Sequence, residues 1–183
     1  MRATCVVVAL AAAVGLAASL AHAAPRRAAP AKPVSLELFG GYSYTKAGEA
    51  SLHGLGLSGS YPLGATLRLV VDLSGHDGSF AGADLGQLGL MAGARWSPSS
   101  GRFRPFAEGL LGGVRTSVSV DVAGARISDA DSDWGLALGG GMDYRLKGRW
   151  SLRSLVHLRL LHGEGAWDTD PRFAIGAVFR LGR

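Results

Sequence analysis

From residue 34 onward, apolar and polar residues alternate along the chain in short segments. Over residues 149–161 the even-numbered positions are almost all apolar, whereas Arg153, His157 and Arg159 occupy odd positions. Successive side chains of a β-strand point to opposite faces of the sheet. Each segment therefore predicts a strand with one apolar face and one face that carries polar or charged side chains.

The alternation predicts eight strands, which cover about 34–45, 51–61, 65–75, 85–96, 104–117, 133–146, 149–161 and 172–181. Short connections at 62–64, 97–102 and 147–148 alternate with longer ones at 76–84, 118–132 and 162–171. Short periplasmic turns and longer outer loops are typical of outer-membrane barrels. We expect an all-β fold, an eight-stranded antiparallel up-and-down transmembrane β-barrel, with its N-terminus in the periplasm.

The alternate strand positions that carry polar residues, which we call the polar parity, hold glycine, serine and a few charges of both signs. This composition suits a narrow interior filled by the barrel's own side chains. Charges in such an interior must pair, because their desolvation is costly. We expect pairs such as Glu37 with Arg180 and Asp72 with Arg95. The residues predicted to lie inside, in a structural role, are Glu37, Arg68, Asp72, Arg95, Asp143, Arg153, His157, Arg159 and Arg180.

The apolar parity is nearly free of charge, which favours a membrane barrel over a soluble secreted one. An arginine that faces lipid at the bilayer midplane costs about 2–4 kcal/mol. A soluble barrel would instead turn its apolar parity inward, and it stays an alternative. Aromatic residues lie at the ends of the predicted strands. Those at the periplasmic ends predict one aromatic girdle, made of Tyr61, Trp96, Tyr144, Trp150 and Phe179.

The first 24 residues read as an export signal rather than as part of the fold. Arg2 precedes an apolar run over 6–20, and Ala21-His22-Ala23 forms an A-x-A cleavage site. We expect a signal peptide at 1–24, a flexible periplasmic linker at 25–33 and the barrel at 34–183. The single cysteine, Cys5, lies in the signal, so the mature chain has no disulfide. Export argues against a nucleic-acid partner, despite a formal net charge of +5.

Four segments carry a resemblance to a known family: Leu38–Tyr44 (LFGGYSY), Arg104–Gly109 (RPFAEG), Gly139–Tyr144 (GGGMDY) and the closing 173–181. They resemble the outer membrane protein A-like β-barrel family, the small porin-like domains of Gram-negative bacteria. The resemblance covers about 34–182 and implies location in the cell outer membrane. It also implies outer-membrane lipid, lipopolysaccharide and the barrel assembly machinery as partners, a monomeric state and no cofactor. Family members commonly end in Phe, whereas here the chain continues for four residues after Phe179.

Asp129, Asp131 and Asp133 occupy positions one, three and five of a sequence that resembles the start of a calcium loop. Position six is Trp134 instead of glycine, and position twelve is Gly140 instead of glutamate. We therefore expect an acidic, solvated outer loop and only a weak candidate metal site. The outer loops contain further acidic residues, which are Asp77, Asp84, Asp121, Asp168 and Asp170. Their carboxylates could bind divalent ions that bridge lipopolysaccharide phosphates.

His157 is the candidate base for a lipid-modifying hydrolase, a class that pairs a histidine with a serine because the base must touch the nucleophile. Ser154 lies three residues before His157 and so on the opposite face, and we expect no catalytic residue. The other histidines, at 53, 76 and 162, fall near predicted loops without partner spacing. The predicted function is a structural or interaction role at the cell surface without an open pore. The alternatives are a narrow porin-like channel and an outer-membrane lipid-modifying hydrolase.

Overall fold

The computed structural model describes residues 35–80, 83–98, 101–122, 125–163 and 165–182. The predicted signal peptide and the linker lie outside the described residues. In the described part of the chain, no helix is long and apolar enough to cross a membrane.

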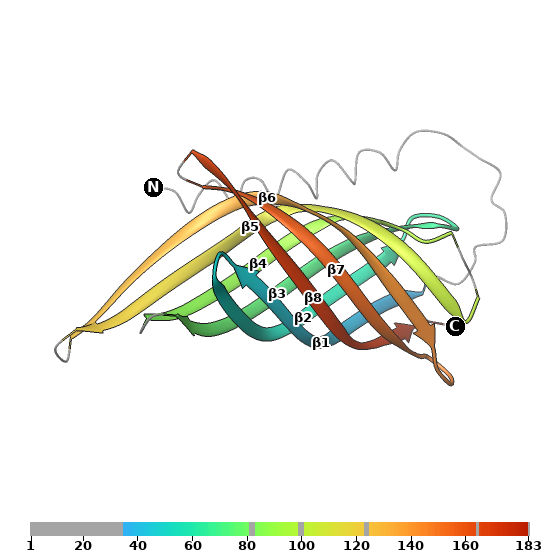
Figure 1. Ribbon diagram of the computed structural model, residues 1–183. Coiled ribbons are helices and arrows are strands. Elements are labelled where there is room, and N and C mark those ends of the chain that lie inside the picture. Colours follow the sequence, from blue (N-terminus) through green and yellow to red (C-terminus); the bar gives the residue numbers. More distant parts are fainter. Residues whose placement is uncertain (1–34, 81–82, 99–100, 123–124, 164, 183) are drawn as a thin grey trace. The chain divides into compact units, whose positions relative to one another are not determined.

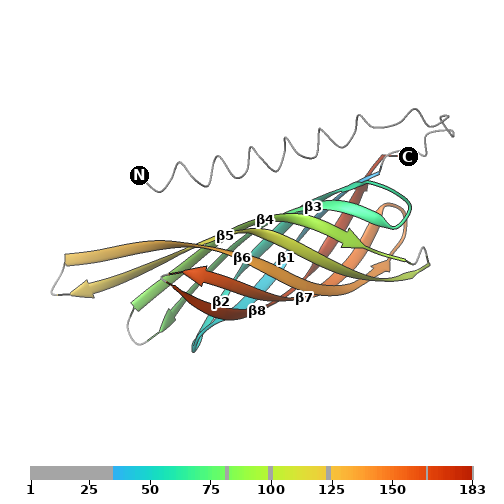
Figure 2. The same ribbon diagram turned by 90° about the horizontal axis from the view of Figure 1, so that it is seen from above.

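The described residues form eight strands that close into one barrel (Figures 1 and 2). The strands are β1 (Leu36–Ala47), β2 (Ala50–Pro62), β3 (Leu67–Phe80), β4 (Ala83–Trp96), β5 (Phe103–Val122), β6 (Ala125–Arg145), β7 (Trp150–Gly163) and β8 (Ala166–Leu181). Each strand pairs antiparallel with the next, and β8 pairs with β1 to close the wall. The prediction of an eight-stranded antiparallel barrel is confirmed.

Glycines allow the barrel to close at the seam between β1 and β8. Gly41 lies opposite Gly176 in the register of these two strands. A Cβ atom built on Gly41 would overlap the backbone of Ile175 and Gly176 on the neighbouring strand. Any larger residue at this seam would therefore push the two strands apart, which explains why glycine is used here in spite of its low strand propensity.

The apolar parity points away from the barrel axis. Leu69, Val156 and Ile175 expose 37–51% of their surface on the outside of the wall, whereas Arg153 and Arg159 on the inner face are 1% exposed. A soluble barrel would show the opposite arrangement, with apolar residues in the centre. The outer face is therefore suited to hydrocarbon, and the soluble alternative is excluded.

The barrel has two distinct ends. The turn end lies where β2, β4 and β6 finish, and it carries the described turn residues 63–66, 97–98, 101–102 and 146–149 together with the first and last described residues. The hairpin end lies where β1, β3, β5 and β7 finish. The prediction of long outer loops is wrong, because the segments 76–84, 118–132 and 162–171 mostly continue the strands. The β5–β6 hairpin, with strands of 20 and 21 residues, extends farthest from the barrel wall (Figures 1 and 2).

The extension of β5 follows from a pattern that continues beyond the predicted strand end. Over 117–120 the sequence reads Ser117-Val118-Ser119-Val120, which still alternates polar and β-branched residues. These residues pair with both neighbours, as Val118 does with Leu85 of β4 and with Asp129 of β6. Strand pairing provides hydrogen-bond partners for backbone N–H and C=O groups, which in a loop would depend on water for them.

Candidate functional site

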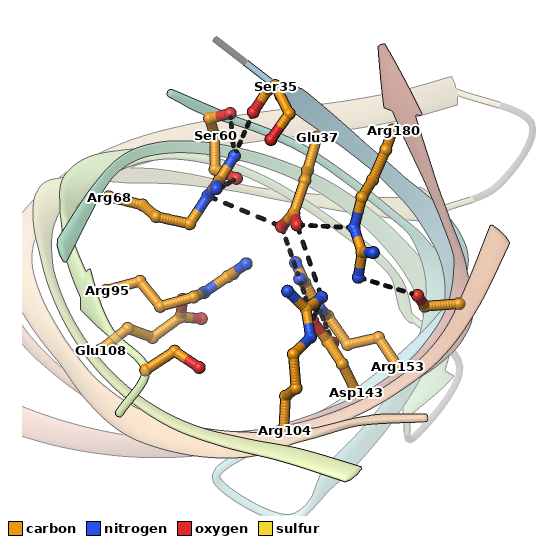
Figure 3. Close-up of polar contacts among 12 residues, drawn as sticks. Ser35, Glu37, Ser60, Arg68, Arg95, Arg104, Glu108, Asp143, Arg153 and Arg180 are labelled. Atoms are coloured by element: carbon orange, nitrogen blue, oxygen red, sulfur yellow. Dashed lines mark hydrogen bonds and ion pairs between the residues drawn. The ribbon is translucent and has the colours of Figure 1, made fainter. Parts of the chain in front are cut away.

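Glu37 of β1 is the centre of an ion-pair network inside the turn end (Figure 3). Its carboxylate lies 3.0 Å from Nε of Arg180 and 3.4 Å from Nη2 of both Arg104 and Arg153. Nε of Arg68 approaches it at 3.6 Å. These arginines come from β8, β5, β7 and β3, so one buried carboxylate connects strands around the whole barrel.

Asp143 of β6 is the second carboxylate of this network. Arg153 donates to it from Nε at 2.6 Å and from Nη2 at 2.9 Å, and Arg104 donates at 3.0 Å. The Arg153 guanidinium also lies 5.1 Å from the ring centroid of Phe106 and 5.7 Å from that of Phe39. Carboxylates and aromatic faces together compensate for the loss of water around this buried cation.

Glu108 of β5 completes the turn-side network. It accepts a hydrogen bond from Nε of Arg95 at 2.5 Å, and its other oxygen lies 2.6 Å from Nε2 of His157. Ser154 is exposed on the outer face of β7, whereas His157 is buried inside. The two side chains are therefore separated by the barrel wall and do not form the base and nucleophile of a hydrolase.

A second polar network lies nearer the hairpin end. Arg172 donates to Asp72 at 2.5 Å and to Oγ of Ser43 at 2.9 Å. Nε2 of His76 lies 2.8 Å from the same hydroxyl. Asp72, His76 and Arg172 are each no more than 3% exposed, so this network is more deeply buried than the outer arginines around Glu37.

Arg159 of β7 extends this hairpin-side network. Its Nη2 donates to Oγ1 of Thr45 and to Oε1 of Gln87, both at 2.6 Å, and lies 3.5 Å from Asp170. Gln87 in turn donates to Asp170 at 3.3 Å. The amide of Gln87 thus connects the cation and the carboxylate, which leaves little of the Arg159 charge uncompensated.

Apolar side chains fill the lumen around the two networks. One cluster packs on the inner faces of β3 to β7, and its members are Val70, Met91, Leu110, Val114, Ala137 and Leu161. The other joins β1 and β8 with β5 and β7, and its members are Phe39, Phe106, Leu155, Ala174 and Val178. The lumen is thus a packed core in which ionic and apolar contacts share the same space.

The structure places all of the predicted interior charges on the inner face of the wall. The predicted pair of Glu37 with Arg180 forms, whereas that of Asp72 with Arg95 does not. Asp72 lies opposite Met91 in the register of β3 with β4, so Arg95 is four residues farther along β4. At about 3.3 Å per residue, this distance is too long for direct contact. Asp72 instead pairs with Arg172, and Arg95 pairs with Glu108.

Besides the hydroxyl groups, sequence reasoning missed six side chains of the two networks as site residues: His76, Gln87, Arg104, Glu108, Asp170 and Arg172. Two of these correct a prediction, since His76 and Asp170 were expected in or near outer loops and lie buried inside. The extension of β3 and β8 toward the hairpin end explains both. The alternation of faces could have identified the two arginines. Arg104 lies an even number of residues from Glu108 on β5, and Arg172 lies an even number from Arg180 on β8, so each pair shares the inner face.

Aromatic side chains surround both ends of the lipid-facing surface. The residues predicted for the girdle lie at the turn end, where Trp150 packs on Phe179 at 4.8 Å and Tyr144 on Phe103 at 4.9 Å between ring centroids. Toward the hairpin end, Trp134 and Trp167 approach each other at 5.6 Å. Aromatic residues at both ends of an apolar outer face are typical of outer-membrane barrels.

Two of the histidines expected near loops without partners are instead members of the aromatic groups at the hairpin end. His162 packs against the rings of both Trp134 and Trp167. His53 lies against the Tyr44 ring at 5.2 Å, and its Nδ1 is 2.5 Å from the Tyr42 hydroxyl. Both imidazoles are on the outer face, where an amphipathic ring suits the membrane interface.

The proposed calcium-loop residues lie in β6 and not in a loop. Asp129, Asp131 and Asp133 occupy alternate positions of an extended strand, which separates neighbouring carboxylates by about 6–7 Å along the chain. Within the described ranges, no group of three acidic, histidine or cysteine residues is arranged to hold a metal ion. The weak candidate metal site is therefore wrong, because strand geometry keeps these side chains from converging.

These aspartates instead lie along an open edge of the hairpin. The pairing of β6 with β7 ends at Trp134 and His162, whereas its pairing with β5 continues to Ala125. The Asp129 and Asp131 carboxylates accept hydrogen bonds from the backbone N–H of Ala130 at 2.9 Å and of Ser132 at 3.1 Å. Charged side chains at a free edge discourage pairing with another strand. The aspartates therefore protect this edge.

Solved structures of outer-membrane barrels resemble this fold. Neisserial surface protein A aligns with a TM-score of 0.58 and 16% identity, over 84% of this chain and all of that chain. The attachment invasion locus protein Ail of Yersinia pestis aligns with a TM-score of 0.57 and 16% identity, over 81% of this chain and 98% of that chain. A major outer membrane protein of Thermus thermophilus aligns with a TM-score of 0.60 and 11% identity, over 80% of this chain and 99% of that chain. No curated protein matches the sequence.

A closed eight-stranded barrel with an apolar outer face and a filled lumen defines a small outer-membrane β-barrel protein. Residues 8–176 match the family described as "Outer membrane protein beta-barrel domain". The chain therefore belongs to this family, and its place is the outer membrane. The predicted resemblance to outer membrane protein A-like barrels is confirmed.

Replacement of the central carboxylate tests the turn-side network. Glu37→Gln leaves the surrounding arginines without one of their counter-charges, and we expect a loss of about 3–5 kcal/mol in the free energy of unfolding. Urea unfolding in lipid vesicles, followed by tryptophan fluorescence, measures this loss. Glu49→Gln, in the exposed link between β1 and β2, is the control and should change the value by less than about 0.5 kcal/mol. Equal stabilities of the two variants would contradict the central role of Glu37.

Removal of the carboxylates from the β6 edge tests their protective role. Asp129→Ala with Asp131→Ala uncovers the backbone donors of Ala130 and Ser132, and we expect concentration-dependent self-association of the barrel in detergent. Chemical cross-linking and light scattering measure it. Asp168→Ala, which removes an exposed carboxylate from β8 at the same end, should leave the barrel monomeric. If both variants associate equally, net charge rather than edge protection explains the effect.

Proposed function

We propose that this protein acts at the cell surface as a structural or interaction protein, through its hairpin end and without an open pore. The observation that carries the proposal is the filled lumen, in which Arg153 lies 1% exposed between carboxylates and aromatic rings. An eight-stranded barrel is just wide enough for its own side chains. With its centre occupied, the barrel offers its two ends for contact with other molecules.

The β5–β6 hairpin is the part of the hairpin end best suited to such contact. It extends beyond the other strands (Figures 1 and 2) and exposes Val118, Val120 and Ile127, the last at 63%. Val120 and Ile127 face each other across the hairpin. A surface role is also what the names Neisserial surface protein A and attachment invasion locus protein state for those two proteins.

We propose the predicted partners on the same grounds. The aromatic groups at both ends fit a barrel in outer-membrane lipid, with lipopolysaccharide around Trp134 and Trp167. Exposed aspartates at the hairpin end would then meet its phosphates through divalent ions. Insertion by the barrel assembly machinery and a monomeric state complete this proposal. A non-enzymatic role is supported by His157, whose Nε2 is occupied by Glu108 inside the wall.

A narrow anion channel is the second candidate function, and one observation favours it. The turn-side network holds more cations than anions: Arg68, Arg95, Arg104, Arg153 and Arg180 against Glu37, Glu108 and Asp143. A lumen with excess positive charge would select anions if it conducted.

Conductance in planar bilayers distinguishes the two functions. We expect no discrete current steps from the refolded barrel, because the Arg153 side chain occupies the lumen between Phe39 and Phe106. Arg153→Ala should produce such steps, since it opens this constriction. Heat-modifiable mobility on gels shows that each barrel is folded. Stable conductance of the unmodified protein would overturn the closed-lumen proposal and support the anion channel.

Cysteine labelling tests which end faces the outside. Ala130 is exposed on the β5–β6 hairpin, and Lys147 is exposed in the turn between β6 and β7. A membrane-impermeant maleimide added to intact cells should label Ala130→Cys at once and Lys147→Cys only after lysis. The parent chain, whose one cysteine lies at position 5, is the control. Labelling of Lys147→Cys on intact cells would reverse the proposed orientation.

A further inference from the structure

Exposed charges are distributed unequally between the two ends of the barrel. The turn-end segments 63–66, 97–102 and 146–149 contain no Asp or Glu. They carry Arg102, Lys147 and Arg149, all exposed, which we call the basic rim. At the hairpin end, Lys46 and Arg115 are accompanied by a larger number of exposed acidic residues, namely Glu49, Asp77, Asp84, Asp129, Asp131 and Asp168.

Backbone hydrogen bonds hold the members of the basic rim on adjoining segments. The N–H of Arg145, at the end of β6, donates to the carbonyl oxygen of Arg102 at 2.8 Å. The N–H of Arg180 on β8 donates to the carbonyl oxygen of Arg149 at 3.0 Å. The β4–β5 turn therefore adjoins the end of β6, and the β6–β7 turn adjoins the end of β8, so the segments that carry the basic rim lie on neighbouring parts of the wall.

The cations of the basic rim lack carboxylate partners. In the part of the chain that the structure describes, no ion pair engages Arg102, Lys147 or Arg149. The carboxylates at this end, Glu37 and Asp143, are buried in the lumen and already bound by other arginines. The rim therefore presents uncompensated positive charge to the surroundings of the turn end.

The basic rim lies directly beside the aromatic girdle. Arg102 places its guanidinium carbon 5.3 Å from the ring centroid of Tyr144, and Arg149 precedes Trp150 in the chain. Aromatic girdles lie at the interface between hydrocarbon and water. Cations just outside the girdle are therefore at the level of the lipid headgroups. The strands extend farthest at the hairpin end, which the proposed function places outside the cell, and on that orientation these headgroups belong to the periplasmic leaflet.

We propose that the basic rim binds anionic phospholipid headgroups of the periplasmic leaflet and enriches them around this end of the barrel. The phosphate oxygens of such a lipid accept hydrogen bonds from guanidinium and ammonium groups. Its net negative charge distinguishes it from a zwitterionic lipid, whose own cation competes with the rim. The position of Arg102 against Tyr144 favours a lipid over a soluble acidic partner, because the girdle keeps this cation at headgroup depth.

Tryptophan quenching by brominated lipids tests the proposal on the full barrel in vesicles. The chain has four tryptophans, so replacement of Trp96, Trp134 and Trp167 by Phe leaves Trp150 as the reporter at the basic rim. We expect brominated phosphatidylglycerol to be preferred over brominated phosphatidylcholine by about fivefold for each cation that a lipid engages. The ratio of the two lipid affinities should fall to about one in the triple variant Arg102→Gln, Lys147→Gln and Arg149→Gln. High salt should have the same effect, because it screens the charges of the rim.

Matched controls separate the basic rim from charge in general. Lys46→Gln with Arg115→Gln removes two cations from the hairpin end and should leave the ratio at Trp150 unchanged. A barrel that keeps only Trp134 should show no preference. Heat-modifiable mobility verifies folding, and Lys147→Gln alone, with a smaller expected loss, serves if the triple variant does not fold.

Two results would overturn the proposal. One is an equal affinity of the unmodified rim for the two lipids at low salt, and the other is a lipid preference that survives the triple substitution. In the second case, loss of sedimentation with peptidoglycan in the triple variant would assign the rim to an acidic glycan. None of these results bears on the hairpin end, so the proposed surface function is tested separately.

Discussion

An ionised side chain that points into a barrel of this width cannot remain solvated, and it must find its counter-charge on another strand. Glu37 shows the consequence, since it holds arginines from β3, β5, β7 and β8 within 3.6 Å. The loss of one partner from such a buried network leaves uncompensated charge, which costs far more than the pair contributes. Strands that are distant in sequence are therefore linked across the lumen as well as through the hydrogen bonds of the wall.

The same requirement fills the lumen with side chains, which is why we propose that the protein functions through its ends. Arginine side chains long enough to cross the interior also fill it, and Phe39 and Phe106 occupy the space between them. At the hairpin end the wall continues as strands instead of loops. Strand pairing provides hydrogen bonds for the backbone of the β5–β6 hairpin, but it leaves one edge of β6 without a neighbouring strand. Asp129 and Asp131 cover the donors of that edge. A charged edge keeps the hairpin available at the surface without inviting aggregation.

Alternation alone predicted the number of strands, their pairing order and the inner face for the nine residues assigned to the interior, because the period of two is a local property. It could not predict which charges meet. Asp72 and Arg95 share the inner face of adjacent strands, yet the register places them four residues apart. Partners across the lumen, such as Asp72 with Arg172, depend on strand tilt, which no local pattern encodes. Strand ends were also misplaced, since serine and aspartate in 118–132 read as loop residues although the valines still alternate.

The unequal charge of the two ends fits the way in which such a barrel reaches its place. In the proposed orientation the chain enters the outer membrane from the periplasm, so the hairpin end would cross the hydrocarbon while the turn end would stay in the periplasm. Cations at Arg102, Lys147 and Arg149 would each be costly to move through the bilayer, and attraction to anionic headgroups would hold them at the surface they first meet. Charge at the turn end and the aromatic rings beside it would thus oppose reversal of the barrel, which agrees with the proposal that the exposed edge of β6 lies outside the cell.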